Sequence, residues 1–297
     1  MSATATEIPA APLAESWRDV VALLKLRIDV LVVCVALAAA AASGTTEPGT
    51  LAVLGLACLA ASAGASVLNH VIDRSLDARM ARTRSRPLPS GRITPRAALV
   101  LGVGLVALSQ AAAPVLGVLP ALYLLAGALT YAVVYTWWLK PRSPWSIVLG
   151  GAAGSFAALA GWEVSQSTLA PAPILLAAVL FLWTPSHFWS LAIVLERDYR
   201  RAGLPMLSAV AGAERTARAV LANTAALVAA SLALAPFAGW PYLAVAAPAG
   251  LGFLACTVDL ARRPDTGRAW RTFKLSGLYL LALLLGLVLA GIPWKGV

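Results

Sequence analysis

Long apolar segments with few charges dominate this chain and leave it few ways to fold. Apolar runs of about 20 residues, the length needed to cross ~30 Å of hydrocarbon, recur along the whole sequence. Charged residues make up 12% of the 297 residues and the mean hydropathy is +0.81, whereas soluble domains carry about 25% charged residues. We therefore expect an all-α integral membrane protein. The runs do not alternate apolar and polar residues, which argues against an outer-membrane β-barrel.

The apolar runs divide the chain into about nine expected transmembrane helices, which form a single domain over residues 28–297. The boundary between the third and fourth helices is weak and lies around Pro114. The nine spans are expected at residues 28–44, 51–71, 97–113, 116–138, 146–162, 171–194, 218–237, 242–260 and 275–293. Ahead of them, residues 1–27 form a separate segment. Residues 1–12 are expected to be disordered, and 13–27 to lie along the membrane surface as an amphipathic stretch.

The positive charge is distributed unevenly between the two sides of the membrane. If successive loops alternate between the sides, all 23 lysines and arginines except Lys295 fall on one side, and Glu47 and Glu163 fall on the other. The positive-inside rule makes the basic side cytoplasmic, together with the N-terminus. Residues 1–27 lack the pattern of a signal or transit peptide, so we expect a bacterial cytoplasmic (inner) membrane. Because the charge flanks the bilayer, it indicates a lipid partner and no nucleic acid, despite a pI of about 10.2.

Three polar residues end the second apolar run, in the segment NHVIDRSLD at residues 69–77. Asn69, Asp73 and Asp77 are spaced four apart, so on an α-helix they share one face with about 40° of drift per step. Two carboxylates and an amide oxygen so arranged suit Mg²⁺ that carries a phosphorylated substrate. Carboxylates at the edge of a membrane segment are functional candidates by default. The alternative interpretation is that these are ordinary charges where a helix leaves the membrane.

An arginine-dense stretch follows directly and suits an anionic ligand. Arg82 and Arg86, with Arg74 as a third choice, can clamp phosphate oxygens through the planar guanidinium group. Tyr135 and Lys140, at the end of a later span, are further candidates for binding a diphosphate. The alternative role for the cationic side chains is anchoring at the inner membrane surface, which we expect for at least half of the loop arginines.

Two sequence motifs carry a resemblance to a known family. The pattern N-x3-D-x3-D, followed by an arginine-rich run that ends R-P-L-x-x-G, resembles the first signature of the UbiA-type intramembrane prenyltransferases. The stretch WTPSHFWSLAIVLERDYRRAGLPML (183–207) is more specific and resembles the protohaem farnesyltransferase (haem O synthase) subfamily. Supporting stretches lie at 135–162 and 268–280, and the resemblance extends over roughly 22–290.

The resemblance implies a UbiA-type fold, in which the second and sixth spans face each other across a central cavity. The activity it implies is farnesyl transfer from farnesyl diphosphate to a vinyl group of haem b, with addition of water and with Mg²⁺ as cofactor. A haem A synthase or an oxidase-assembly protein is then a candidate partner. Asp198 joins the first-motif residues as an expected catalytic metal ligand, with Glu196 as a further one. Many superfamily members place two aspartates here, whereas this chain has Leu195 and Tyr199.

Two histidines are candidate haem ligands. His187 lies mid-span beside Trp183, Phe188 and Trp189, and an imidazole in apolar surroundings is a natural axial ligand for haem iron. The three aromatic side chains would also shield an allylic cation from water. The alternative for His187 is a hydrogen-bonded core histidine. His70 projects about 100° away from Asn69 on the same helix, so it either reaches the haem or faces a helix interface.

Two other functions remain open on the sequence alone. One is a related prenyltransferase whose acceptor is an aromatic quinone precursor; a full aspartate pair in the second motif would favour it, and the H-F-W stretch argues against it. The other is a non-enzymatic transporter or haem-handling protein, since intramembrane acids and prolines also occur in transporters. Mg²⁺-dependent release of diphosphate separates the enzymes from the carrier.

Overall fold

The computed structural model describes residues 17–45, 47–166 and 168–291, and throughout these ranges the secondary structure is helical. The prediction for residues 1–12 lies outside the described residues. The elements are α1 (Trp17–Leu23), α2 (Leu26–Ala42), α3 (Pro48–Ile72), α4 (Arg74–Asp77), α5 (Pro95–Gln110), α6 (Ala113–Leu116), α7 (Val118–Leu129), the π-helix η1 (Thr130–Leu139), α8 (Ser146–Gly150), α9 (Ala152–Glu163), α10 (Pro171–Val194), α11 (Glu196–Ala202), α12 (Leu207–Ala233), α13 (Ala235–Arg262) and α14 (Thr266–Gly291).

Within the described ranges, seven helical segments are long and apolar enough to cross a membrane. They are α3, α5 with α6, α7 with η1, α10, α12, α13 and α14. The other two expected spans correspond to α2, which has 17 residues, and to α8 and α9, which are separated at Gly151. The all-α membrane class is confirmed, but the count of nine is not.

The expected boundary near Pro114 is displaced in the structure. Pro114 lies inside α6, and the chain turns at Gly117, which adopts a φ of 94°. Glycine takes this left-handed conformation without the clash that a Cβ would cause, whereas a proline near a helix start is compatible with helical backbone. The turn therefore follows the glycine, three residues later than the proline suggested.

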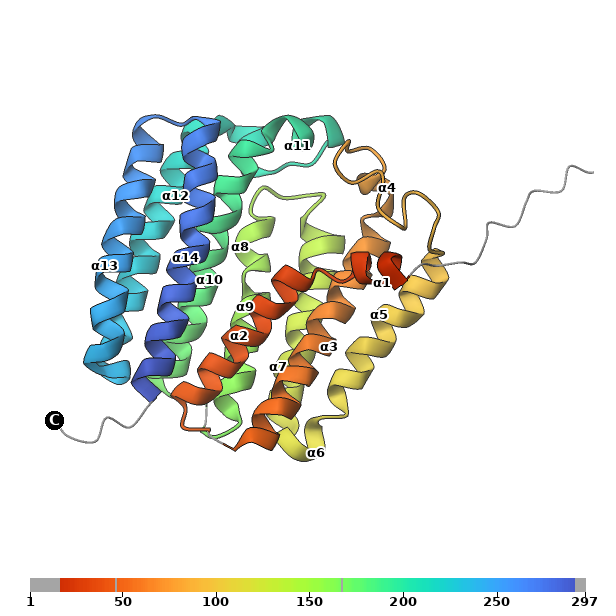
Figure 1. Cartoon of the computed structure of the whole chain (residues 1–297). Helices are drawn as coiled ribbons and strands as arrows, with labels where there is room; N and C mark the ends of the chain where they lie inside the picture. Colours follow the sequence, from red (N-terminus) through yellow and green to blue (C-terminus); the bar gives the residue numbers. More distant parts are fainter. Residues whose placement is uncertain (1–16, 46, 167, 292–297) are drawn as a thin grey trace, which may run out of the picture.

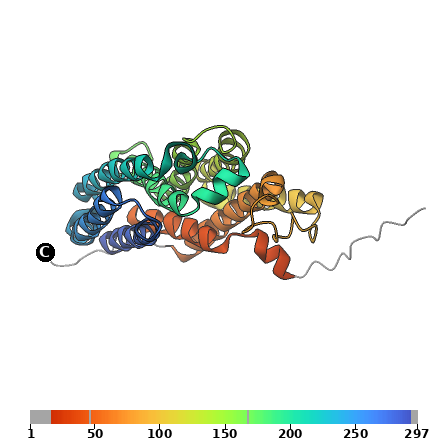
Figure 2. The same cartoon turned by 90° about the horizontal axis from the view of Figure 1, so that it is seen from above.

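The helices form a bundle whose two halves are joined by α2. In one half α3 packs on α5 and α7, and in the other α10 packs on α12 and α14, while α2 contacts α3, α9 and α14 (Figures 1 and 2). The short helices α4 and α11 and the turn between α13 and α14 lie at the same end of the bundle, drawn in the upper part of Figure 1. We call this the motif end, because both sequence motifs reach it.

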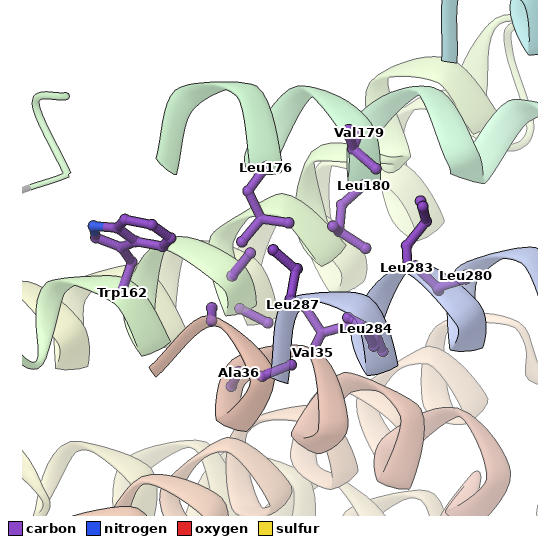
Figure 3. Packing of buried hydrophobic residues seen from close by; sticks show 14 of the residues in the cluster. Val35, Ala36, Trp162, Leu176, Val179, Leu180, Leu280, Leu283, Leu284 and Leu287 are labelled. Carbon is purple, nitrogen blue, oxygen red and sulfur yellow. The ribbon is translucent and has the colours of Figure 1, made fainter. Parts of the chain in front are cut away.

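The half of the bundle away from the motif end is closed by apolar packing. Val35 on α2, Leu180 on α10 and Leu284 on α14 are among the buried residues that meet there (Figure 3). At Gly161, a Cβ would lie 2.0 Å from the backbone oxygen of Ala36, so α9 and α2 are in direct backbone contact. Small residues allow such close approach between membrane helices. The packing leaves the polar groups of α3 at the opposite, motif end.

Candidate active site

The first motif folds as two helices that meet at Asp73. This residue ends α3 and starts α4, yet the helical spacing survives, because the amides of Asp73 and Asp77 donate to the carbonyls of Asn69 and Asp73 at 2.9 and 2.8 Å. All three side chains are only 2% exposed. The predicted common face is thus retained, and it is turned into the protein.

A network of hydrogen bonds and ion pairs surrounds Asn69 and Asp73. The Asn69 amide donates to Asp73 Oδ2 and to Thr136 Oγ1, both at 2.9 Å, and its oxygen accepts from Lys25. Lys25 Nζ also donates to the Tyr131 hydroxyl at 2.8 Å. Burial, and next the Arg86 charge, lower the pKa of Lys25 to about 8. Three helices, α2, α3 and η1, thereby converge on one polar centre.

Lys140 and Arg86 supply the cations that face the two carboxylates. Lys140 forms an ion pair with Asp73 Oδ2, and Arg86 donates to Asp77 Oδ2 at 2.8 Å. His70 is also buried, with its Nδ1 3.8 Å from the same Asp77 oxygen and without a hydrogen-bond partner. The predicted Arg86 and Lys140 are therefore part of the site, and His70 lies beside it.

The π-helix η1 explains how Lys140 reaches the site. In an α-helix, residues five apart point about 140° away from each other. A π-helix bonds each residue to the fifth one before it, and the Lys140 amide donates to the Tyr135 carbonyl at 2.8 Å. The wider turn brings Tyr131, Thr136 and Lys140 onto the face that meets Asn69 and Asp73. Tyr135 stacks on Tyr131, with ring centroids 5.7 Å apart.

The remaining first-motif arginines lie at the edge of the site. Arg74 is exposed on α4, and Arg82 is exposed in the loop after it. Arg82 nevertheless acts on Tyr199 of the second motif: burial raises the pKa of this tyrosine, and the Arg82 charge opposes the shift. Asp198 and Asp73 are the next charges that act on the Tyr199 hydroxyl. Tyr199, which stands where many superfamily members have an aspartate, thus responds to charges from both motifs.

The second motif contributes fewer groups to the centre than the first. Glu196 pairs with Arg200 at 2.9 Å along α11. Asp198 is half-buried and lines a hollow of about 190 Å³ between α11 and the first-motif loop, together with Arg79, Arg84 and Arg201. In the part of the chain that the structure describes, no three acidic, histidine or cysteine side chains are close enough to form a metal cluster. Among the described residues, Asp198 and Asp73 therefore do not belong to one ligand set.

The first-motif oxygens nevertheless fit a hard cation. Asp73 Oδ1 is buried and has no hydrogen-bond partner. An orphaned carboxylate oxygen is costly in a protein interior. Asn69 and Asp77 supply further oxygen atoms on the same helical face, and oxygen is the donor that Mg²⁺ prefers.

His187 lies in an aromatic stack between α10 and α14. Its ring stacks on Trp183 at 4.5 Å and lies 4.3 Å from Phe273, while Nδ1 is hydrogen-bonded to Ser276 Oγ at 2.6 Å. Phe188 meets the imidazole edge-on at 5.1 Å. Trp189 differs from the prediction in its surroundings, since it contacts Trp145 and belongs to a separate hydrophobic cluster. Two of the three predicted aromatic neighbours therefore surround this histidine.

The buried acidic residues lie at the end of a long apolar helix, and the class of protein that the fold defines is that of the intramembrane prenyltransferases. The UbiA prenyltransferase family matches residues 30–291, and the chain belongs to this family. It is 45% identical to protoheme IX farnesyltransferase 2 of Paramagnetospirillum magneticum, over 88% of this chain and 92% of that protein.

Two solved structures share the fold. A UbiA homologue from Aeropyrum pernix K1 superimposes with a TM-score of 0.73 at 21% identity, covering 90% of this chain and 98% of that one. A UbiA homologue from Archaeoglobus fulgidus bound to GPP and Mg²⁺ superimposes with a TM-score of 0.66 at 19% identity, covering 91% and 99%. The UbiA-type fold expected from the motifs is confirmed.

Proposed function

We propose that this protein transfers a farnesyl group from farnesyl diphosphate to a vinyl group of haem b and adds water, which yields haem O. The observation that supports this most directly is the buried network of Asn69, Asp73, Lys140 and Lys25 at the motif end. The 45% identity to a protoheme IX farnesyltransferase points to the same donor and acceptor.

The cations of the site bind and orient the diphosphate. Lys25 and Lys140 lie on either side of Asn69 and Asp73, and Arg86 lies beside Asp77. Ionisation of the allylic C–O bond places negative charge on the departing diphosphate, and fixed positive groups stabilise that charge as it develops. Arg82 and Arg74, which are exposed, assist at the entrance. The Tyr131 hydroxyl borders the same centre, and the Tyr135 ring stacks on Tyr131.

Asn69, Asp73 and Asp77 would hold Mg²⁺ at the first motif, while Asp198 and Glu196, which lie outside that ligand set, would hold Mg²⁺ separately at the second. The bound ion supplies electrostatic stabilisation of the leaving diphosphate. The partnerless Asp73 Oδ1 supports this ligand set. The A. fulgidus homologue bound to GPP and Mg²⁺ has the same fold.

The haem lies between the first motif and α10 in this proposal. His187 is the axial ligand, because its ring is oriented by Ser276 and by the Trp183 and Phe273 rings. A hydrogen bond to one ring nitrogen fixes the orientation that the other presents to iron. Phe188 and Trp189 exclude water near the reacting alkene, and His70 is a second-choice ligand.

The motif end is the cytoplasmic end, and the membrane is the bacterial inner membrane. This assignment follows the position of the lysines and arginines. A haem A synthase or an oxidase-assembly protein is the expected recipient of the product.

One mass measurement tests the activity. Purified protein is incubated with haem b, farnesyl diphosphate and Mg²⁺, and the haem product is analysed together with released diphosphate. We expect a haem whose mass has risen by one farnesyl group plus water. Diphosphate release without this haem product would indicate another acceptor, and no release would indicate a carrier.

A further inference from the structure

Asp29 is a fully buried carboxylate that the binding of diphosphate does not use. It lies in the first turn of α2, is 0% exposed, and its Oδ1 accepts hydrogen bonds from Ser62 Oγ at 2.6 Å and Ser66 Oγ at 3.1 Å. Its Oδ2 is buried and has no partner. A carboxylate oxygen left without a partner in a membrane protein is costly, and such a residue is a functional candidate.

The position of Asp29 relates it to the site. Ser62, Ser66, Asn69 and Asp73 follow one another at intervals of four, three and four residues, so they share one face of α3. Ser66 precedes Asp73 by seven residues and therefore lies about 10 Å deeper along the helix axis. Asp29, which accepts from Ser62 and Ser66, is thus expected deeper along α3 than the centre at which the diphosphate is proposed to bind. The allylic carbon is bonded to a diphosphate oxygen, and the isoprenoid chain is expected to run from it towards this depth.

We propose that Asp29 accepts the proton of the water that completes the reaction, an inference that rests on the proposed function. The farnesyl C–O bond breaks and its electron pair leaves with diphosphate. The vinyl π electrons form the new C–C bond, which leaves a cation on the vinyl carbon beside the porphyrin. Water forms the C–O bond to this carbon and loses one proton to Asp29 Oδ2. The product keeps the hydroxyl group, and no oxidant or reductant is needed.

The other buried acids are less suited to this role. Asp73 is paired with Lys140, and Asp77 with Arg86, so their charges already interact with cations. In Asp29, the two serine hydroxyls hold one carboxylate oxygen and leave the other free to orient water. His70, His187 and the diphosphate are the competing proton acceptors, and the test below separates them from Asp29.

The test is the amount of hydroxylated haem formed per diphosphate released. Asp29→Asn is compared with wild type in detergent, with haem b, farnesyl diphosphate and Mg²⁺. We expect diphosphate release to persist while the hydroxylated product per diphosphate falls about 10²-fold, the usual size of a general-base contribution. A farnesylated haem lighter by one water, formed by proton loss from the cation, should replace it. Asp19→Asn, which removes an acid paired with Arg92 outside the site, should match wild type.

The other possible outcomes of this experiment contradict the role of Asp29 or the proposed function. An unchanged product ratio in Asp29→Asn, or loss of diphosphate release together with product, would overturn the proposal. If Asp29→Asn does not fold, as judged by gel filtration, the double variant Ser62→Ala/Ser66→Ala takes its place. This variant keeps the carboxylate but removes the two hydrogen bonds that orient it. The amount of hydroxylated haem per diphosphate should therefore fall, and an unchanged amount would again contradict the proposal. Failure of the wild type to release diphosphate would refute the proposed function instead.

Discussion

Asp73 combines two features that rarely occur together in a structural ion pair. One of its buried oxygens is paired with Lys140 and accepts from Asn69, while the other has no partner. A purely structural pair would satisfy both oxygens, because an unsatisfied buried polar atom lowers stability. The free oxygen therefore indicates a ligand-binding role.

Asp73→Asn is predicted to reduce diphosphate release by at least ~10²-fold, because it removes charge that stabilises the reacting complex. The absorption spectrum of bound haem should stay unchanged, since His187 is held by α14 and not by this network. Steady-state diphosphate release and haem spectra measure the two effects. Asp265→Asn, at the turn before α14, is the matched control and should retain activity. Activity of Asp73→Asn above a tenth of wild type would remove this residue from the site.

At the residue scale, the sequence was sufficient where the chemistry is local. Asn69, Asp73 and Asp77 were predictable because their spacing fixes a common helical face. Lys25 was missed as a site residue, since its contacts with Asn69 and Tyr131 arise only when α2 packs on α3 and η1. A lysine directly ahead of an apolar span was the available signal.

At the level of elements, η1 sets the register of the site. Its wide turns align Tyr131, Thr136 and Lys140 on one face. These residues are spaced five and then four apart, and the α-helical period would not place all three on the same face. This is why the sequence predicted Lys140 only from its position at a helix end. The span boundary was predicted at Pro114, but the chain turns at Gly117, because this glycine adopts a positive φ that the sequence pattern does not reveal.

Deletion of Val133 is predicted to abolish diphosphate release. Removing one residue favours ordinary α-helical spacing, which turns Lys140 away from Asp73 and breaks a buried ion pair. Val133 is exposed, so Val133→Ala is the matched control and should remain close to wild type. Helical content by circular dichroism identifies a deletion that merely unfolds. A folded deletion variant with full activity would show that the π-helix is dispensable.

Gly161→Ala is predicted to destabilise the protein by about 1–3 kcal/mol, the usual cost of overpacking. Its Cβ would meet the Ala36 carbonyl at 2.0 Å, and a backbone atom moves less easily than a side chain. Gly154→Ala, on the same helix with no atom within 4 Å of the added Cβ, is the control and should be neutral or slightly stabilising. Thermal unfolding in detergent compares the two. Equal midpoints would mean that α2 and α9 are not in contact in the membrane.

At the scale of the whole molecule, charge and chemistry lie at the same end of the bundle. The first motif, α11 and the turn between α13 and α14 all lie at this end (Figure 1), and most of the lysines and arginines lie in or next to these segments. Glu47 caps the start of α3 and Glu163 ends α9, and both lie at the helix ends that are away from the motif end. The positions of lysine and arginine along the sequence predict that this end faces the cytoplasm, because these residues are retained on the cytoplasmic side. Farnesyl diphosphate would then enter from the cytoplasm, with its diphosphate at the motif end and its isoprenoid chain in the apolar half of the bundle.

This orientation predicts opposite labelling of two engineered cysteines. In a background without Cys34, Cys58 and Cys256, Ser90→Cys lies in the exposed loop at the motif end, and Ser165→Cys is exposed at the far end. A membrane-impermeant maleimide added to spheroplasts should label the cysteine at 165 and spare the one at 90. Inverted membrane vesicles should give the reverse. The opposite pattern would place the motif end outside the cell, where the diphosphate substrate would have to enter from the wrong side.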